Sequence, residues 1–148
     1  MNTWYYPHHH RLTERIQRTL DSHGKALLID AHSFSSQPLP CDLDQRPDRP
    51  DICIGTEKFH TPSQLEEAFF FAFRSTGWTV RLNTPFAGAL VPARLYRRDR
   101  RLAAVMIEVN RALYVDESTG ERKPCFTSVA RTIRQHVASA ISLMTLED

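Results

Sequence analysis

Apolar residues at helical spacing mark three segments of the chain as amphipathic helices. In the first segment, over positions 11–22, an apolar residue recurs every four residues. The second begins at Thr61, which precedes a proline and an apolar stripe, so we expect Thr61 to cap a helix that ends before Gly77. The third covers positions 127–146, and its expected buried stripe is Val129, Ile133, Val137, Ala140, Ile141 and Met144.

Four short apolar runs lie between these helices and predict β-strands. The runs occupy residues 25–32, 51–55, 79–83 and 103–110. The first and the last are almost continuously apolar, which is typical of central strands buried on both faces of a parallel sheet. Because strands alternate with helices, the sequence predicts a layered α/β fold. The 148 residues fit a single domain over positions 1–148.

Polar side chains stand at or near the carboxyl ends of the predicted strands. They are Asp30, His32, Asn83, Glu108 and Asn110. In sheets of this type, ligands bind in the crevice outside the carboxyl ends of the strands. We therefore expect these side chains to form the functional site.

His32 is the candidate metal ligand of this group. A neutral imidazole binds zinc well, and a nearby carboxylate such as Asp30 can fix its tautomer through a hydrogen bond. The alternative is a histidine whose ring hydrogen-bonds only to a backbone carbonyl.

Glu108 is the candidate acid–base group. A carboxylate within a buried strand is costly unless it is paired, hydrogen-bonded or bound to a cation. Partial burial raises the pKa of a carboxyl group and suits it to proton transfer. Strand alternation places Glu108 on the same face as Asn110. The alternative role is a salt bridge, with Arg111 as its partner.

Two further clusters admit more than one interpretation. Of the consecutive residues His8, His9 and His10, at most two can face one site, and His9 could contact an anionic substrate. The segment 94–101 holds five arginines in eight residues, which suits nucleic-acid binding. A solvated turn between two strands is the favoured interpretation, because the rest of the chain is balanced in charge.

The composition argues against several classes of partner and against secretion. With 19 Lys and Arg against 17 Asp and Glu, the formal net charge of +2 gives no reason to expect nucleic acid or an anionic membrane. No apolar run approaches the ~18 residues of a membrane span. Three widely spaced cysteines without a CxxC pair predict free thiols in a reducing cytoplasm, and the N-terminus does not resemble a signal peptide. The chain also lacks the GxGxxG, GxxxxGK[ST], GxSxG and HExxH motifs and shows no complete set of zinc ligands.

Five sequence blocks carry a resemblance to a known family. They are residues 6–12 (YPHHHRL), 28–33 (LIDAHS), 50–55 (PDICIG), 83–88 (NTPFAG) and 107–117 (IEVNRALYVDE). In this order and spacing, they resemble the C-terminal portion of the N-formylglutamate amidohydrolase family, over nearly the whole chain.

The resemblance implies both a fold and a reaction. The fold is a three-layer α/β sandwich with a mixed, mostly parallel sheet, like that of zinc carboxypeptidases. The reaction is zinc-dependent hydrolysis of a small-molecule N-acyl amino acid. N-formyl-L-glutamate would yield L-glutamate and formate, which is a step of histidine degradation.

The resemblance also assigns roles to residues. His32 matches the zinc-ligating histidine, and Glu108 matches the strand glutamate that acts as general base and acid. His9 matches a histidine near the substrate. The positions that match groups holding substrate carboxylates or orienting the site are Asn83, Asn110 and Arg111.

The chain departs from the family at its start. Family members carry an additional N-terminal segment, whose His-Ser-Gly block and acidic residue complete the zinc site, so His32 is the only inherited ligand. Three outcomes follow. The chain is a non-catalytic homologue that acts as a binding or interaction module, or a fragment completed by another polypeptide or a second copy through an exposed sheet edge, or a protein that rebuilds its metal site from His8, His9 or His10.

Overall fold

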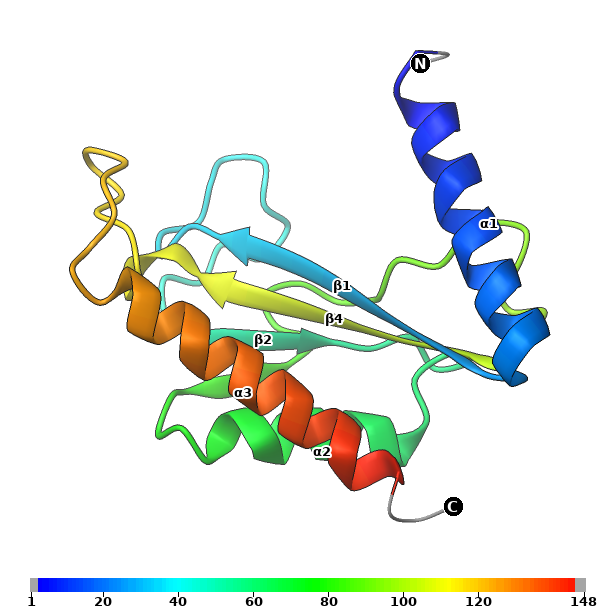
Figure 1. Ribbon diagram of the computed structural model, residues 1–148. Helices are drawn as coiled ribbons and strands as arrows, with labels where there is room; N and C mark the ends of the chain where they lie inside the picture. The colour runs from blue at the N-terminus through cyan, green and yellow to red at the C-terminus, as the bar shows by residue number, and fades with distance from the viewer. Residues whose placement is uncertain (1–2, 146–148) are drawn as a thin grey trace.

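The computed structural model describes residues 3–145 (Figure 1). Its helices are α1 (Tyr5–His23), α2 (Ser63–Arg74) and α3 (Phe126–Thr145), with a short 3-10 helix, η1 (Arg111–Leu113). Its strands are β1 (Ala26–Phe34), β2 (Ile52–Gly55), β3 (Val80–Leu82) and β4 (Leu102–Asn110). Each predicted helix and strand is present, and apart from the start of α1 each lies within a few residues of its expected bounds, so the α/β class is confirmed.

Helix α1 begins six residues before the predicted helix. The added turns carry exposed aromatic side chains, and the ring of Tyr5 contacts the ring of His9 one turn later, at 4.3 Å between centroids. Only Ile16 and Leu20 of this helix are buried. Apolar periodicity marks only the packed part of a helix, so it could not indicate the part that projects from the sheet.

Helix α2 begins at Ser63 and lacks the cap expected from Thr61. No side chain caps its first turn, and Pro62 occupies the capping position. The Thr61 hydroxyl instead donates to the carbonyl oxygen of Ala104 at 2.6 Å and accepts from the N–H of Glu57 at 2.9 Å. The prediction of a Thr61 cap was wrong because these tertiary hydrogen bonds to β4 and to the turn after β2 use the hydroxyl.

The four strands form one mixed sheet in the order β1-β4-β2-β3. β1 runs parallel to β4, and β2 runs parallel to β3, whereas β2 and β4 are antiparallel. Two of the three pairings are therefore parallel, which confirms a mixed, mostly parallel sheet. Strand β4 is the long inner strand and is buried along almost its whole length.

β1 is an edge strand, contrary to the expectation of a central strand buried on both faces. Its residues 26–30 are partly buried, but residues 31–33 are exposed. Its apolar run therefore reflects contacts with helices on both faces rather than strands on both sides.

Helices α2 and α3 cover one face of the sheet (Figure 1). On this face, Val105, Ile107 and Val109 of β4 pack against Phe69 and Phe73 of α2. From α3, Ala140 is fully buried within the same cluster. The neighbouring Ile141 is 37% exposed, so its expected burial was wrong: the buried stripe of α3 passes through Ala140.

Helix α1 packs against the opposite face, at the amino ends of β1 and β4 (Figure 1). Its Ile16 and Leu20 contact Leu102, with Leu28 of β1 at the margin of the cluster. Leu28 and Leu102 alternate with the residues that face α2 and α3, so helices lie on both faces of the sheet. Within residues 3–145, none of the helices combines the length and the apolar character that a membrane span requires.

Candidate active site

His32, Glu108 and Cys53 lie side by side across three strands. His32 of β1 is the register partner of Glu108 in β4, and Cys53 of β2 is the register partner of Glu108 on its other side. Side chains at paired positions point to the same face of a sheet. The face they share is the one opposite α2 and α3, so these three side chains form the floor of the candidate site.

The structure contains the hydrogen bond expected between Asp30 and His32. Nε2 of His32 donates to Oδ1 of Asp30 at 2.8 Å, and the His32 side chain is about half exposed. A carboxylate can only accept here, so this bond places the proton of the neutral ring on Nε2. Nδ1 then keeps the lone pair that accepts a proton or binds a metal. A role of His32 in metal binding stays a prediction.

Glu108 is buried, with 8% of the residue exposed. Its Oε2 has no hydrogen-bond partner. Burial raises the pKa of this carboxyl, and the Asp30 charge adds to the rise while His32 and Arg111 oppose it. A carboxyl group in this environment resists ionisation, so it can hold a proton at a higher pH than an exposed carboxyl group can.

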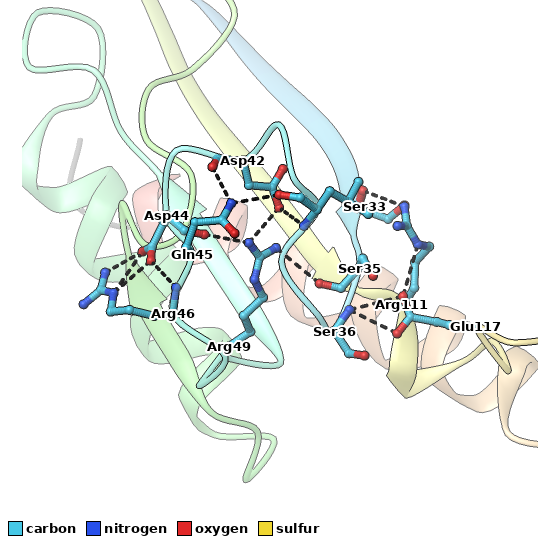
Figure 2. Close-up of polar contacts among 11 residues, drawn as sticks. Ser33, Ser35, Ser36, Asp42, Asp44, Gln45, Arg46, Arg49, Arg111 and Glu117 are labelled. Atoms are coloured by element: carbon cyan, nitrogen blue, oxygen red, sulfur yellow. Dashed lines mark hydrogen bonds and ion pairs between the residues drawn. The ribbon is translucent and has the colours of Figure 1, made fainter.

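Arg111 does not form the alternative salt bridge with Glu108. Its Nε pairs with Oε1 of Glu117 at 3.4 Å, and its Nη1 donates to the carbonyl oxygen of Ser33 at 3.4 Å (Figure 2). The Glu117 carboxylate also accepts from the N–H of Ser36. Arg111 therefore lies at the rim of the site, where it still lowers the pKa of Glu108.

Cys53 is a member of the site that the sequence did not single out. Its buried thiol donates to the carbonyl oxygen of Phe86 at 3.1 Å. Burial raises the pKa of the thiol, and the nearby Glu108 charge contributes to the rise. Cys53 is therefore a neutral donor that holds the segment after β3 against the floor. The available signal was the alternation of side-chain direction along a strand, which places Cys53 on the face opposite Ile52 and Ile54.

Arg49 is the second residue that the sequence did not indicate. It anchors the proline-rich segment 35–50 beside the site (Figure 2). The side chain of Arg49 is 2% exposed; it pairs with Asp42 at 2.7 Å and donates to the carbonyl oxygens of Ser35 and Asp44. Its guanidinium carbon lies 5.8 Å from the ring centroid of Phe34. A lone arginine between prolines carries no periodic signal, so only the tertiary structure reveals this anchor.

The two asparagines expected at the site use their amides to hold the backbone. Asn110 donates to the carbonyl oxygen of Pro50 at 3.0 Å and accepts from the N–H of Ala112 at 3.1 Å, which caps η1. Asn83 accepts from the N–H of Thr56 and donates to its hydroxyl, both at 2.8 Å. Both amides are thus engaged within the chain.

The sheet topology also separates Asn83 from the other strand ends. β3 runs antiparallel to β4. The carboxyl end of β3 therefore lies at the opposite end of the sheet from the carboxyl ends of β1 and β4. The expectation of one shared edge assumed that all strands are parallel, and the antiparallel step between β2 and β4 removes that premise.

His9 is not brought together with Glu108 and His32. It lies in the projecting half of α1, whereas the packed half of this helix contacts Leu102 at the amino end of β4 (Figure 1). Glu108 stands six residues further along β4, which corresponds to about 20 Å of strand.

The donor side chains present here do not make a complete zinc site. Within residues 3–145, no three His, Cys, Asp or Glu side chains are placed to hold one metal ion. A catalytic zinc takes three protein ligands and keeps one open position. His32 offers one imidazole nitrogen, and residues 3–145 do not place two further ligands beside it.

A small apolar pocket of about 190 Å³ opens beside His32. It lies between β4 and α3 and is lined by Val109, Tyr114, Phe126, Val129 and Ile133. Apart from the imidazole of His32 and the Tyr114 hydroxyl, its lining is apolar, so it offers no charged group to a substrate carboxylate.

Residues 1–115 match the sequence model of the N-formylglutamate amidohydrolase family. Two solved structures have a similar fold. The N-formylglutamate amidohydrolase from Ralstonia eutropha is 24% identical, with a TM-score of 0.77 over 99% of this chain and 52% of that chain. A gene product from Agrobacterium tumefaciens is 24% identical, with a TM-score of 0.63 over 97% of this chain and 52% of that chain.

The chain therefore spans about half the length of each solved structure it matches. No curated protein matches it in sequence. The matched segment, residues 1–115 of 148, is well over half of the chain and contains Asp30, His32, Glu108 and the strands that carry them. The chain belongs to the N-formylglutamate amidohydrolase family.

Proposed function

We propose that this domain contributes an amide-hydrolysing site for a small N-acyl amino acid, with N-formyl-L-glutamate as the candidate substrate. The products would be L-glutamate and formate, as in histidine degradation. The observation that carries the proposal is the juxtaposition of a buried carboxyl, Glu108, with the Asp30–His32 pair in the neighbouring strand. The free cysteines Cys41, Cys53 and Cys125 are consistent with the expected reducing cytoplasm.

Glu108 has the properties of the general base and acid in this reaction. It takes a proton from the water whose oxygen bonds to the acyl carbon, and it returns that proton to the amine nitrogen as the carbon–nitrogen bond breaks. The raised pKa of Glu108 supports both steps, because the carboxyl can hold the proton between them.

His32 and Arg111 have supporting roles in the proposal. The hydrogen bond from Nε2 of His32 to Asp30 leaves the lone pair of Nδ1, which accepts a hydrogen bond from the attacking water when no metal is bound and would hold zinc when the metal is present. Arg111 is partly exposed at the rim and can form a second, bidentate contact with a substrate carboxylate. Asn83, Asn110 and His9 have no direct contact with substrate in this scheme.

Zinc dependence stays a prediction. His32 is the one residue of this group that we assign as its ligand, and the described donors do not complete the site. Each step above therefore uses only groups of the chain itself.

An assay of N-formyl-L-glutamate hydrolysis, in which the formate released is measured, tests the proposal. We expect Glu108→Gln to lower turnover at least 100-fold, the usual contribution of a positioned acid–base group, with the fold unchanged by circular dichroism. The matched control is Glu67→Gln, an exposed glutamate on α2 across the sheet, which should keep the activity of the unmodified protein. Unchanged turnover in Glu108→Gln would remove this residue from the mechanism.

A non-catalytic binding module is the second candidate function. The incomplete donor set and the exposed outer edge of β1 favour it. Metal analysis of the purified protein, combined with the same assay, separates the two candidates. An inert protein without stoichiometric zinc supports the binding module, whereas zinc that is lost in His32→Ala supports the enzyme.

A further inference from the structure

A second pocket, which is lined by polar side chains, lies at the other end of the sheet from Glu108. It has a volume of about 290 Å³ and is lined by Glu57, Lys58, Phe59, Arg97 and Arg100. The turn that carries Glu57 follows β2 and is fixed to the start of β4, where the N–H of Ala104 donates to the carbonyl oxygen of His60 at 2.7 Å. The site proposed for hydrolysis uses none of the residues that line this pocket.

The backbone of Arg97 is held in a conformation that side chains other than glycine rarely adopt. Its φ is +55°, and its N–H donates to Nε2 of His60 at 2.8 Å. His60 is 1% exposed, and its Nδ1 lies 2.8 Å from the carbonyl oxygen of Leu102. A carbonyl only accepts and an N–H only donates, so the His60 ring is neutral, with its proton on Nδ1. This buried ring fixes the position of Arg97, and such local strain is commonly found at functional sites.

The guanidinium of Arg97 is oriented by the buried carboxylate of Glu57. Nη2 and Nε of Arg97 lie 2.7 Å and 2.8 Å from Oε1 of Glu57. The other carboxylate oxygen accepts from the N–H groups of Phe59 and His60. Burial favours protonation of Glu57, but the hydrogen bonds from Arg97 and these N–H groups lower its pKa below the ordinary value. Glu57 is therefore an ionised anchor, while 60% of the Arg97 side chain stays accessible.

Two more cations complete the pocket wall. The guanidinium carbon of Arg100 lies 4.3 Å from the centroid of the Phe59 ring, a cation–π contact that orients this side chain. Lys58 lines the same pocket. Three cations thus face one carboxylate, and that carboxylate is already occupied by hydrogen bonds. The pocket has a surplus of two positive charges, and the Arg97 guanidinium is held in place by Glu57 before any ligand arrives.

We propose that this pocket binds a phosphate group, either as inorganic phosphate or on a small phosphomonoester. A doubly charged tetrahedral oxyanion matches the surplus charge, and arginine forks bind phosphate through paired N–H donors. The volume lies at the small end of ligand pockets, which suits a compact anion. A concave pocket in a chain of net charge +2 does not offer the extended basic surface that a nucleic acid requires.

Isothermal titration with inorganic phosphate, at constant ionic strength set with chloride, tests the proposal. We expect saturable binding with one site per chain. Arg100→Ala should weaken it about tenfold, the usual effect of losing one charge-assisted hydrogen bond. The control is Arg18→Ala, which removes one exposed charge from α1 and should leave phosphate affinity unchanged.

Further titrations with other ligands identify the ligand class. A small phosphomonoester that competes with phosphate would support the proposal. Tighter binding of glutarate than of phosphate would overturn it in favour of a carboxylate site. Binding of a short single-stranded oligonucleotide without binding of phosphate would overturn it in favour of nucleic acid. Equal loss of affinity in Arg100→Ala and Arg18→Ala would show a general charge effect and would also overturn it.

Discussion

One carboxylate oxygen, Oε2 of Glu108, is buried without a hydrogen-bond partner. Leaving such a group in water would favour its ionised form, whereas burial here disfavours the charge. The neighbouring Asp30 carboxylate disfavours it further. The cost of this arrangement is what makes Glu108 a candidate for proton transfer rather than a structural residue.

The raised pKa of Glu108 makes stability depend on pH in a specific direction. Between the ordinary value of 4.5 and the raised value, the folded protein holds a proton that the unfolded chain has released. The contribution of Glu108 to the free energy of unfolding is therefore greatest below 4.5 and is lost as the pH rises through this interval. Glutamine cannot ionise, so Glu108→Gln should lack this fall.

Denaturant unfolding of both proteins between pH 4 and pH 8 checks this prediction. We expect the stability of Glu108→Gln relative to the unmodified protein to increase with pH. If the free energies of unfolding of the two proteins differ by the same amount at every pH, burial does not raise the pKa of Glu108.

The Asp30–His32 hydrogen bond should fix the tautomer of His32. In the unmodified protein, nitrogen-15 NMR should find the proton of the neutral ring on Nε2. Asp30→Ala should give a mixture of tautomers and lower any hydrolytic activity about tenfold, as expected for the partner of a functional histidine. His60 is the internal control, because its proton stays on Nδ1, where it faces the carbonyl oxygen of Leu102. A His32 spectrum that does not change would contradict the assigned bond.

At the scale of elements, the sequence predicted those features that follow from local periodicity. The strand 103–110 was indicated by its apolar run, and the exceptional position of Glu108 within it was visible for the same reason. The position of β1 at the edge and the antiparallel step between β2 and β4 depend on long-range pairing, which no local pattern encodes. The separate position of Asn83 follows from that step.

Predictions from local sequence patterns failed where a side chain bonds to a residue outside its own element. Thr61 precedes a helix at the correct spacing for a cap, yet its hydroxyl bonds to β4 instead. Arg49 stands in a segment without periodicity, yet it is among the most enclosed charged side chains of the site region. Such residues can be recognised only when the segments they join are placed in space.

The segment 35–50 should depend on Arg49 for its order. Arg49→Lys keeps the charge but loses the fork that reaches the carbonyl oxygens of Ser35 and Asp44 (Figure 2). We expect a loss of about 2 kcal/mol in the free energy of unfolding, the usual magnitude for hydrogen bonds from a charged donor. Hydrogen exchange should accelerate in residues 35–50.

Arg46→Lys is the matched control, because Arg46 lies in the same segment and pairs with Asp44 at the exposed surface. It should change neither stability nor exchange measurably. Equal effects of the two substitutions would show that Arg49 has no special role in holding the segment.

At the scale of the whole molecule, the two proposed sites lie at opposite ends of the sheet. Asp30, His32 and Glu108 lie toward the carboxyl ends of β1 and β4, and the basic pocket lies beside their amino ends. Helices α2 and α3 cover the opposite face of the sheet (Figure 1). One edge of the same sheet, the outer side of β1, has no neighbouring strand among residues 3–145.

This edge leads to a prediction about association. An unpaired strand presents N–H and C=O groups that can pair with another strand, and proteins often protect such edges with lysine. Residues 31–33 of β1 are exposed and carry no such charge.

We expect the chain to dimerise through β1 as its concentration rises, and Ala31→Lys to shift the dimer toward monomer. Size-exclusion chromatography with light scattering measures both. The control is Gln135→Lys, which adds the same charge at an exposed position of α3, away from the edge. A protein that stays monomeric at every concentration, or a dimer that both substitutions weaken equally, would exclude pairing through β1.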